Sequence, residues 1–104
     1  MALPLLNGVR VLELALLMPA DHVGGILGDL GAEVIKVESN TRIGLFGRLP
    51  SWAPQDLGIP PSDILQGANT FNADKRCLGL ELKTPEGRSI LDKIIAKSDV
   101  FLTN

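Results

Sequence analysis

The stretch "DLGAEVIKVES" (residues 29–39) decides the fold of this chain, because it joins the end of a helix directly to a buried strand. Gly31 suits the left-handed residue that commonly ends a helix. The β-branched residues of "EVIKVE" then form an apolar run typical of a strand buried in a parallel sheet, and the run closes on Glu38. A helix that leads into such a strand indicates a βαβ unit.

Elements that complete this unit lie on the amino-terminal side. "VRVLELALL" (9–17) is rich in β-branched and aliphatic residues and predicts a first strand. From Ala20 to Leu30 the apolar residues recur at offsets of three and four, which predicts an amphipathic helix with Asp21 and Asp29 off its apolar face. The second strand is predicted over 33–38.

The carboxyl-terminal half repeats the pattern after a long interruption. Residues 39–67 are rich in proline and glycine, show no sustained period and predict a long loop. "CLGLELK" (77–83) predicts a third strand, and "DVFLTN" (99–104) a fourth. Between them Thr84 is the expected N-cap of a helix that has Pro85 in its first position. The buried stripe of this helix is predicted to be Ile90, Leu91, Ile94 and Ile95.

The order β-α-β, long loop, β-α-β predicts an α/β fold, a Rossmann-like parallel half-sheet with right-handed crossovers. Ligands of such sheets bind at the carboxyl ends of the strands. Because the last strand has no covering helix after it, we expect the chain to be a fragment of a larger domain.

Glu38 at the end of a strand suggests dinucleotide binding, in which a carboxylate there holds a ribose. That function requires G-x-G-x-x-G in the turn after the first strand. The corresponding turn, "LLMPAD" (16–21), contains no glycine. Gly24, Gly25 and Gly28 come later, inside the predicted helix, where they favour close packing of helix on sheet. Dinucleotide binding is therefore disfavoured, and Glu38 is either a solvated residue or part of another site.

Composition excludes several classes of function. The chain has 104 residues and a net charge of −2, so it has no basic surface of the kind that binds nucleic acid. Cys77 is the only cysteine, which argues against a disulfide framework or a cysteine-based zinc site, and we expect it to be buried. No segment resembles a signal peptide or the roughly 20 apolar residues of a membrane span. We expect a cytoplasmic protein without a metal site.

Four motifs, in order, resemble the amino-terminal segment of family III CoA-transferases, the CaiB/BaiF family, which includes α-methylacyl-CoA racemases. They are "GVRVLEL", "GDLGAEVIKVE", "FNADKRCLGLELKTPEGRSIL" and "SDVFLTN". The family pattern runs G-x-x-V-L-D, A-G-P, L-A-D-L-G-A-E-V-I-K-V-E, N-x-x-K-R-S, D-L-K-x-x-x-G and A-D-V-x-x-x-N-F. The match covers nearly the whole chain outside the proline-rich loop, so residues 1–104 are identified as the amino-terminal part of the family's large, Rossmann-like domain.

The resemblance implies acyl-CoA chemistry, either transfer of CoA between carboxylic acids or epimerisation of an acyl-CoA. In the family an aspartate attacks the thioester and forms acyl-anhydride and enzyme-thioester intermediates. This aspartate would lie beyond Asn104, so we expect no catalytic residue here and no activity of the chain alone. The resemblance further implies an interlocked homodimer, acyl-CoA and carboxylic acids as substrates, and no tightly bound cofactor.

The resemblance also implies which residues contact CoA. The family uses the turn after the first strand, the D-L-K segment, and an asparagine after the fourth strand. The matching positions here are Met18, Pro19, Leu80, Glu81, Leu82, Lys83 and Asn104. Lys83 would serve as a point charge for a CoA phosphate, or else be a solvated lysine at a strand end. Asn72, Lys75 and Arg76 match N-x-x-K-R, and would shape the loop and add positive charge near the phosphates, or be solvated at the surface.

Three departures from the family pattern concern the CoA contacts rather than the fold. Ala-Gly-Pro is replaced by Pro19-Ala20-Asp21, and the aspartate of D-L-K is Glu81. Ser39 follows the second strand where the family often has proline or arginine. Two classes of function therefore remain: the amino-terminal piece of an acyl-CoA enzyme, and a truncated, non-catalytic paralogue.

Overall fold

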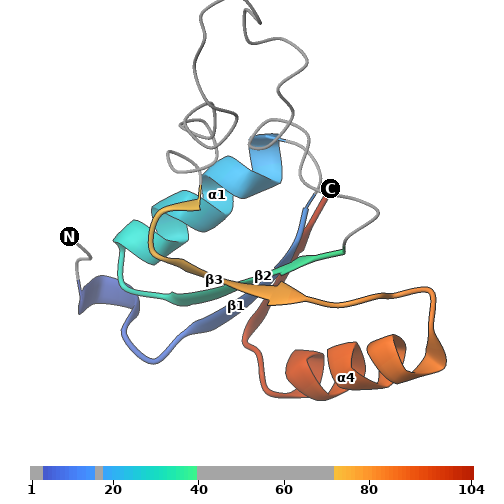
Figure 1. The fold of residues 1–104 in the computed structure, drawn as a ribbon. Helices are drawn as coiled ribbons and strands as arrows, with labels where there is room; N and C mark the ends of the chain where they lie inside the picture. Colours follow the sequence, from blue (N-terminus) through green and yellow to red (C-terminus); the bar gives the residue numbers. More distant parts are fainter. Residues whose placement is uncertain (1–3, 16–17, 40–71) are drawn as a thin grey trace, which may run out of the picture.

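The computed structural model describes residues 4–15, 18–39 and 72–104, and these form a four-stranded sheet with a helix on each face (Figure 1). Its elements are a short 3-10 helix (Pro4–Leu6), β1 (Arg10–Leu14), α1 (Met18–Asp29), β2 (Glu33–Glu38), β3 (Lys75–Gly79), α4 (Pro85–Ala96) and β4 (Val100–Thr103). The predicted loop 39–67 lies outside the described residues except for Ser39.

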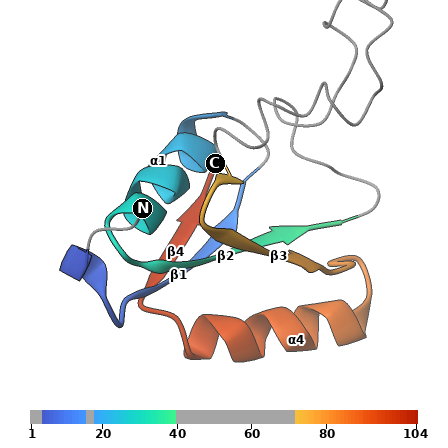
Figure 2. The ribbon, with the colours of Figure 1, turned by 60° about the vertical axis from the view of Figure 1, so that its left-hand side comes forward.

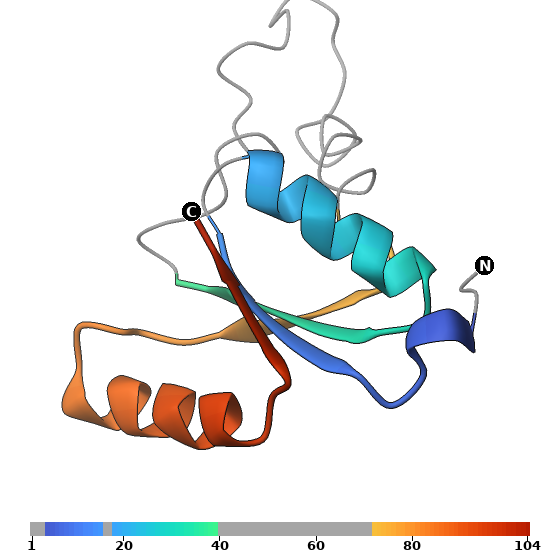
Figure 3. The same ribbon diagram turned by 180° about the vertical axis from the view of Figure 1, so that it is seen from behind.

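The predicted parallel half-sheet is confirmed. The strand order is β3-β2-β1-β4, and all three neighbouring pairs are parallel. Figure 2 shows β4 beside β1, on the side away from β2. The carboxyl ends of all strands consequently meet at one edge of the sheet, where the carboxyl terminus of the chain also lies (Figure 3).

Helix α1 ends as the sequence predicts but starts earlier. Gly31 has a φ of 100°, and the Gly31 and Ala32 amides donate to the carbonyls of Gly28 (2.9 Å) and Leu27 (3.0 Å). These two bonds satisfy carbonyls of the last turn, in the Schellman arrangement. The first turn begins at Met18 rather than Ala20, because the strand before it ends at Leu14 instead of Leu17.

The prediction of a strand over 77–83 was wrong in its boundaries. β3 runs from Lys75 to Gly79, and the Leu80 amide makes one more bond, to the Glu38 carbonyl (2.8 Å). Pairing stops there because β2 ends at Glu38. Residues 80–83 form instead the connection to α4, whose predicted cap is confirmed: the Thr84 hydroxyl accepts a hydrogen bond from the Gly87 amide at 3.1 Å.

The two faces of the sheet are covered unequally. On the α1 face Val11, Ala32 and Val34 form a core against which Leu27 and Leu102 pack. On the α4 face Ile90 and Ile95 remain 44% and 37% exposed and Phe101 48%, so the expectation of a fully buried α4 stripe was wrong. The expectation of a buried Cys77 was also wrong, since β3 is an edge strand and the thiol is exposed. Among the described residues, no helix is long and apolar enough to cross a membrane.

Candidate functional site

A cavity of about 310 Å³ lies at the carboxyl edge of the sheet. It is bounded by the ends of β1, β2 and β4 and by the connection between β3 and α4. Its lining residues are Leu14, Ala15, Val37, Ser39, Leu80, Glu81, Leu82, Lys83, Thr103 and Asn104. Five of the seven residues predicted to contact CoA therefore come together in one cavity, although 20 residues of sequence separate Lys83 from Asn104.

The other two predicted residues lie elsewhere. Met18 and Pro19 form the first turn of α1, and Pro19 does not line the cavity. Leu14 and Val37 alternate along their strands with Glu13 and Lys36, which lie on the α1 face, so the cavity opens on the α4 face. The structure thus separates the predicted contacts into two groups at the same edge of the sheet.

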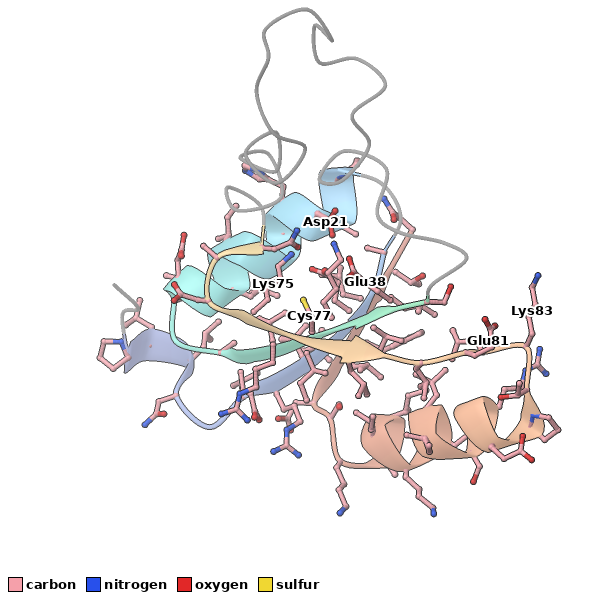
Figure 4. The ribbon with its side chains drawn as sticks, in the orientation of Figure 1. Asp21, Glu38, Lys75, Cys77, Glu81 and Lys83 are labelled. Carbon is pink, nitrogen blue, oxygen red and sulfur yellow. The ribbon has the colours of Figure 1, made fainter. Side chains whose placement is uncertain are left out.

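The residues that line the cavity are mostly apolar, and the charged ones lie on the connection between β3 and α4. Among the described residues that line it, Lys83 is the only basic one and Glu81 the only acidic one. The Glu81 carboxylate is engaged locally, since its Oε1 accepts a hydrogen bond from the Lys83 amide at 3.1 Å. Figure 4 shows Glu81 and Lys83 on the connection before α4, well away from Asp21 and Lys75. The exposed Lys83 ammonium is therefore the group best placed to attract an anion here.

A larger cavity of about 610 Å³ lies at the opposite, amino-terminal edge of the sheet. Two of its arginines pair with one carboxylate: Glu33 Oε2 is 2.6 Å from Arg10 Nε, and Glu33 Oε1 is 3.2 Å from Arg76 Nη1. The hydrogen bond from Arg10 lowers the pKa of the Glu33 carboxyl. Arg76 consequently lines this cavity and not the one at the carboxyl edge, and this edge is not the candidate site.

Four charged side chains are buried between α1 and the sheet, and we call Glu13, Asp21, Lys36 and Lys75 the buried ionic cluster. Each is at most 2% exposed. Lys75 Nζ donates to Glu13 Oε1 at 2.8 Å and to the Asp21 backbone carbonyl at 2.8 Å. Lys36 Nζ donates to the Asp21 carboxylate and, at 3.0 Å, to Asn72 Oδ1. Two cations and two anions thus compensate one another under the helix.

This cluster corrects several expectations. Asp21 was predicted to lie off the buried face of α1, and it is buried. Lys75 was predicted either to support CoA phosphates or to be solvated, and its ammonium is instead enclosed with Glu13. Asn72 contacts both cluster lysines, at 3.0 Å and 3.2 Å.

Glu13 and Lys36 were not singled out from the sequence, although a signal exists. Both are charged residues in the middle of otherwise apolar strands, and they have opposite signs. In the sheet they are paired in register across β1 and β2. Gly24 of α1 packs on Glu13 so closely that a Cβ atom would lie 1.8 Å from Glu13 Oε1, which explains a glycine inside a helix.

Burial raises the pKa of Glu13 from 4.5 to about 7, against the opposing influence of Lys75 and Lys36. A folded-state pKa above the unfolded value means that the folded protein holds a proton which the unfolded chain releases. The contribution of Glu13 to the free energy of unfolding should therefore fall as the pH rises from 4.5 to 7 and stay constant above that.

We expect Glu13→Gln to remove this slope, since glutamine does not titrate. Urea unfolding of wild type and variant at several pH values between 4.5 and 8 measures the difference directly. Glu33 does not interfere, because its lowered pKa places its loss of stability below pH 4.5. A difference between the two proteins that is independent of pH would show that Glu13 titrates normally.

The described residues contain no group of three or more His, Cys, Asp or Glu side chains arranged to hold a metal ion. The mostly apolar lining of the cavity at the carboxyl edge and the exposed Lys83 suit a ligand that is apolar in one part and anionic in another.

Comparison with known proteins identifies the family. Residues 6–104 match the family model of CoA-transferase family III. The succinate–glutarate CoA-transferase of Agrobacterium fabrum is 36% identical over 103 residues, which are 97% of this chain and 25% of that protein. The α-methylacyl-CoA racemase of Mus musculus is 35% identical over 97 residues, 93% of this chain and 19% of that protein.

Solved structures agree with the sequence relatives. The crystal structure of a CaiB/BaiF family protein from Brucella suis superposes with a TM-score of 0.72 at 33% identity, covering 97% of this chain and 25% of that one. The chain thus spans about a fifth to a quarter of the length of these relatives. The four-stranded parallel sheet, the order of the motifs and these matches agree, and the chain belongs to CoA-transferase family III, the CaiB/BaiF family.

Proposed function

We propose that the protein is an acyl-CoA enzyme that transfers CoA between carboxylic acids, and that residues 1–104 contribute part of its CoA site. The observation that supports this most directly is the cavity at the carboxyl edge of the sheet. It gathers Leu80, Glu81, Leu82, Lys83 and Asn104, which match the family's CoA-binding positions. Its apolar lining residues and the exposed Lys83 suit a ligand with both apolar and phosphorylated parts.

The proposed reaction proceeds through a carboxylate nucleophile, an aspartate outside residues 1–104. Its oxygen attacks the thioester carbonyl carbon, and the C–S bond breaks to give an acyl-aspartyl anhydride and CoA thiolate. The thiolate then attacks the aspartyl carbonyl, which releases the first carboxylic acid and leaves an aspartyl-CoA thioester. The second acid takes up CoA by the reverse sequence. Throughout, the task of residues 1–104 is to hold CoA in place.

Met18 and Pro19 belong to this proposal as a separate contact. They begin α1 at the same edge of the sheet, and Pro19 does not line the cavity. CoA is an extended molecule, so two groups of contacts are compatible with one ligand. We further propose that the full-length protein is a homodimer, as the family is.

A second candidate is an acyl-CoA racemase, which the 35% identity to a mouse α-methylacyl-CoA racemase favours. Both reactions need a CoA site, so the cavity is common to them. Incubation of the full-length protein with an acyl-CoA in deuterated water distinguishes the two. A racemase incorporates deuterium next to the thioester carbonyl without any acceptor acid, whereas a transferase forms a new acyl-CoA only when an acceptor is added. CoA binding with neither reaction would indicate a non-catalytic paralogue.

Lys83→Ala should weaken binding of CoA to the full-length protein by about fivefold, the scale of one solvent-exposed ion pair of about 1 kcal/mol. The difference should shrink at high salt, because the charges are exposed and screened. Calorimetric titration with CoA at low and high salt measures it. Lys93→Ala, an exposed lysine on α4 that does not line the cavity, is the control. Equal affinity of Lys83→Ala and wild type at both salt concentrations would remove Lys83 from the site.

A further inference from the structure

We propose that Arg88, together with Glu81, is a positioning residue that fixes the peptide between Leu82 and Lys83 and thereby aims Lys83 at the ligand. This inference rests on the proposed function of the cavity. Arg88 does not line that cavity. It lies with Leu82, Leu91 and Asp92 around a separate hollow, so it contacts the segment 80–83 from the side opposite the cavity. We call residues 80–83 the cavity wall.

Residues 80–83 belong to no helix or strand, so the position of this wall depends on individual hydrogen bonds. The Leu80 amide donates to the Glu38 carbonyl at 2.8 Å, which continues the sheet for one residue. The Glu81 carbonyl accepts from the Thr84 hydroxyl at 2.9 Å. These two bonds fix Leu80 and Glu81. The position of Leu82 and Lys83 depends on hydrogen bonds with other side chains.

The Leu82–Lys83 peptide is held from both of its polar atoms. The Leu82 carbonyl accepts a hydrogen bond from Arg88 Nε at 3.1 Å, and the Lys83 amide donates to Glu81 Oε1 at 3.1 Å. These two groups belong to the same planar peptide unit. Holding its oxygen and its hydrogen together restricts rotation of the plane, and so favours one direction for the bond from Cα of Lys83 to its side chain.

The alternative is that Arg88 acts by its own charge on a phosphate. The two possibilities predict different behaviour of two substitutions. In glutamine the side-chain amide nitrogen is as many bonds from Cα as Nε is in arginine, so Arg88→Gln keeps the donor to Leu82 and removes the charge. Arg88→Met has neither donor nor charge.

Calorimetric titration of the full-length protein with CoA tests the proposal. We expect Arg88→Gln to bind within about twofold of wild type and Arg88→Met to bind about threefold more weakly, the scale of one hydrogen bond. In a Lys83→Ala background, Arg88→Met should cause no further loss of CoA affinity, because the lysine side chain that Arg88 orients is absent. Circular dichroism of each variant checks that the helix signal is unchanged.

Three results would overturn the positioning role: equal losses for Arg88→Gln and Arg88→Met, additive losses for Arg88→Met and Lys83→Ala, or full affinity of Arg88→Met. If any of these occurs while Lys83→Ala alone weakens binding, the CoA site stands and only the role of Arg88 fails. If Lys83→Ala has no effect, the assigned role of Lys83 fails as well.

Discussion

Lys75→Met should lower the free energy of unfolding by about 3–5 kcal/mol, the usual cost of removing one member of a buried ion pair. The Lys75 ammonium donates to both carboxylate oxygens of Glu13, at 2.8 Å and 3.1 Å, and neither residue is exposed. Methionine fills a similar volume without a charge. The substitution therefore leaves the Glu13 carboxylate buried beside Asp21, with Lys36 3.8 Å away as its remaining cation.

The substitution should also weaken the contact between β3 and α1. Lys75 Nζ also donates to the Asp21 backbone carbonyl in the first turn of α1, and so connects β3 to that helix. Urea unfolding of the full-length protein at pH 8, above the pKa of Glu13 in the wild-type protein, measures the change. Lys93→Met is the matched control, since Lys93 is exposed on α4 and should tolerate the change.

The double variant Glu13→Gln/Lys75→Met separates charge from packing. Removing both charges leaves no uncompensated ion, and such replacements are often close to neutral. We expect the double variant to recover more than half of the loss caused by Lys75→Met. If the double variant is as unstable as the sum of the two single variants, the residues do not interact and the cost has another origin.

The fold could be predicted from the sequence to a large extent, because the signals that specify it are local. Gly31 marks the end of α1, Thr84 and Pro85 mark the start of α4, and apolar runs mark β1 and β2. Alternation of helices and strands then limits the topology to a parallel sheet. The end of β3 could not be predicted, since it depends on where its neighbour β2 ends and not on the apolar residues Leu80 and Leu82.

Exposure was predicted less well than secondary structure, for a physical reason. A period of 3.6 shows which side of α4 is apolar, but not how completely another element covers it. Ile90 and Ile95 are on the apolar side and still remain partly exposed. Conversely, a charged residue is predicted to lie at the surface unless its oppositely charged partner is known. The partners of Asp21 and Lys75 come from other elements, so their burial was missed.

The residues of the candidate site were predicted from the family motif, but the motif does not show how they are arranged in space. Lys83 and Asn104 meet in one cavity because the β3–α4 connection and the end of β4 reach the same edge of the sheet. Arg88 was missed since it contributes through the Leu82 carbonyl and not through a motif position. Its role can be read only from the hydrogen bonds of the connection.

Gly87→Ala should be the most damaging single change around the cavity, with a loss of about 2–3 kcal/mol in the free energy of unfolding. A Cβ atom at this position would lie 1.8 Å from the backbone oxygen of Glu81 and 3.0 Å from Thr84 Oγ1. A backbone carbonyl cannot move aside as the end of a flexible side chain can. The clash should therefore outweigh the roughly 1 kcal/mol that alanine gains over glycine in a helix.

The same substitution should impair binding, because the clash falls on the wall that presents Lys83. Moving Glu81 displaces the carboxylate that holds the Lys83 amide, so CoA affinity should fall by at least the roughly fivefold expected for Lys83→Ala. Gly79→Ala is the matched control: it lies at the other end of the connection, and a Cβ there meets no atom within 4 Å. Thermal melts and CoA titrations of both variants of the full-length protein measure the two effects. If Gly87→Ala behaves like Gly79→Ala, the wall adjusts freely, and its position is not what selects glycine at residue 87.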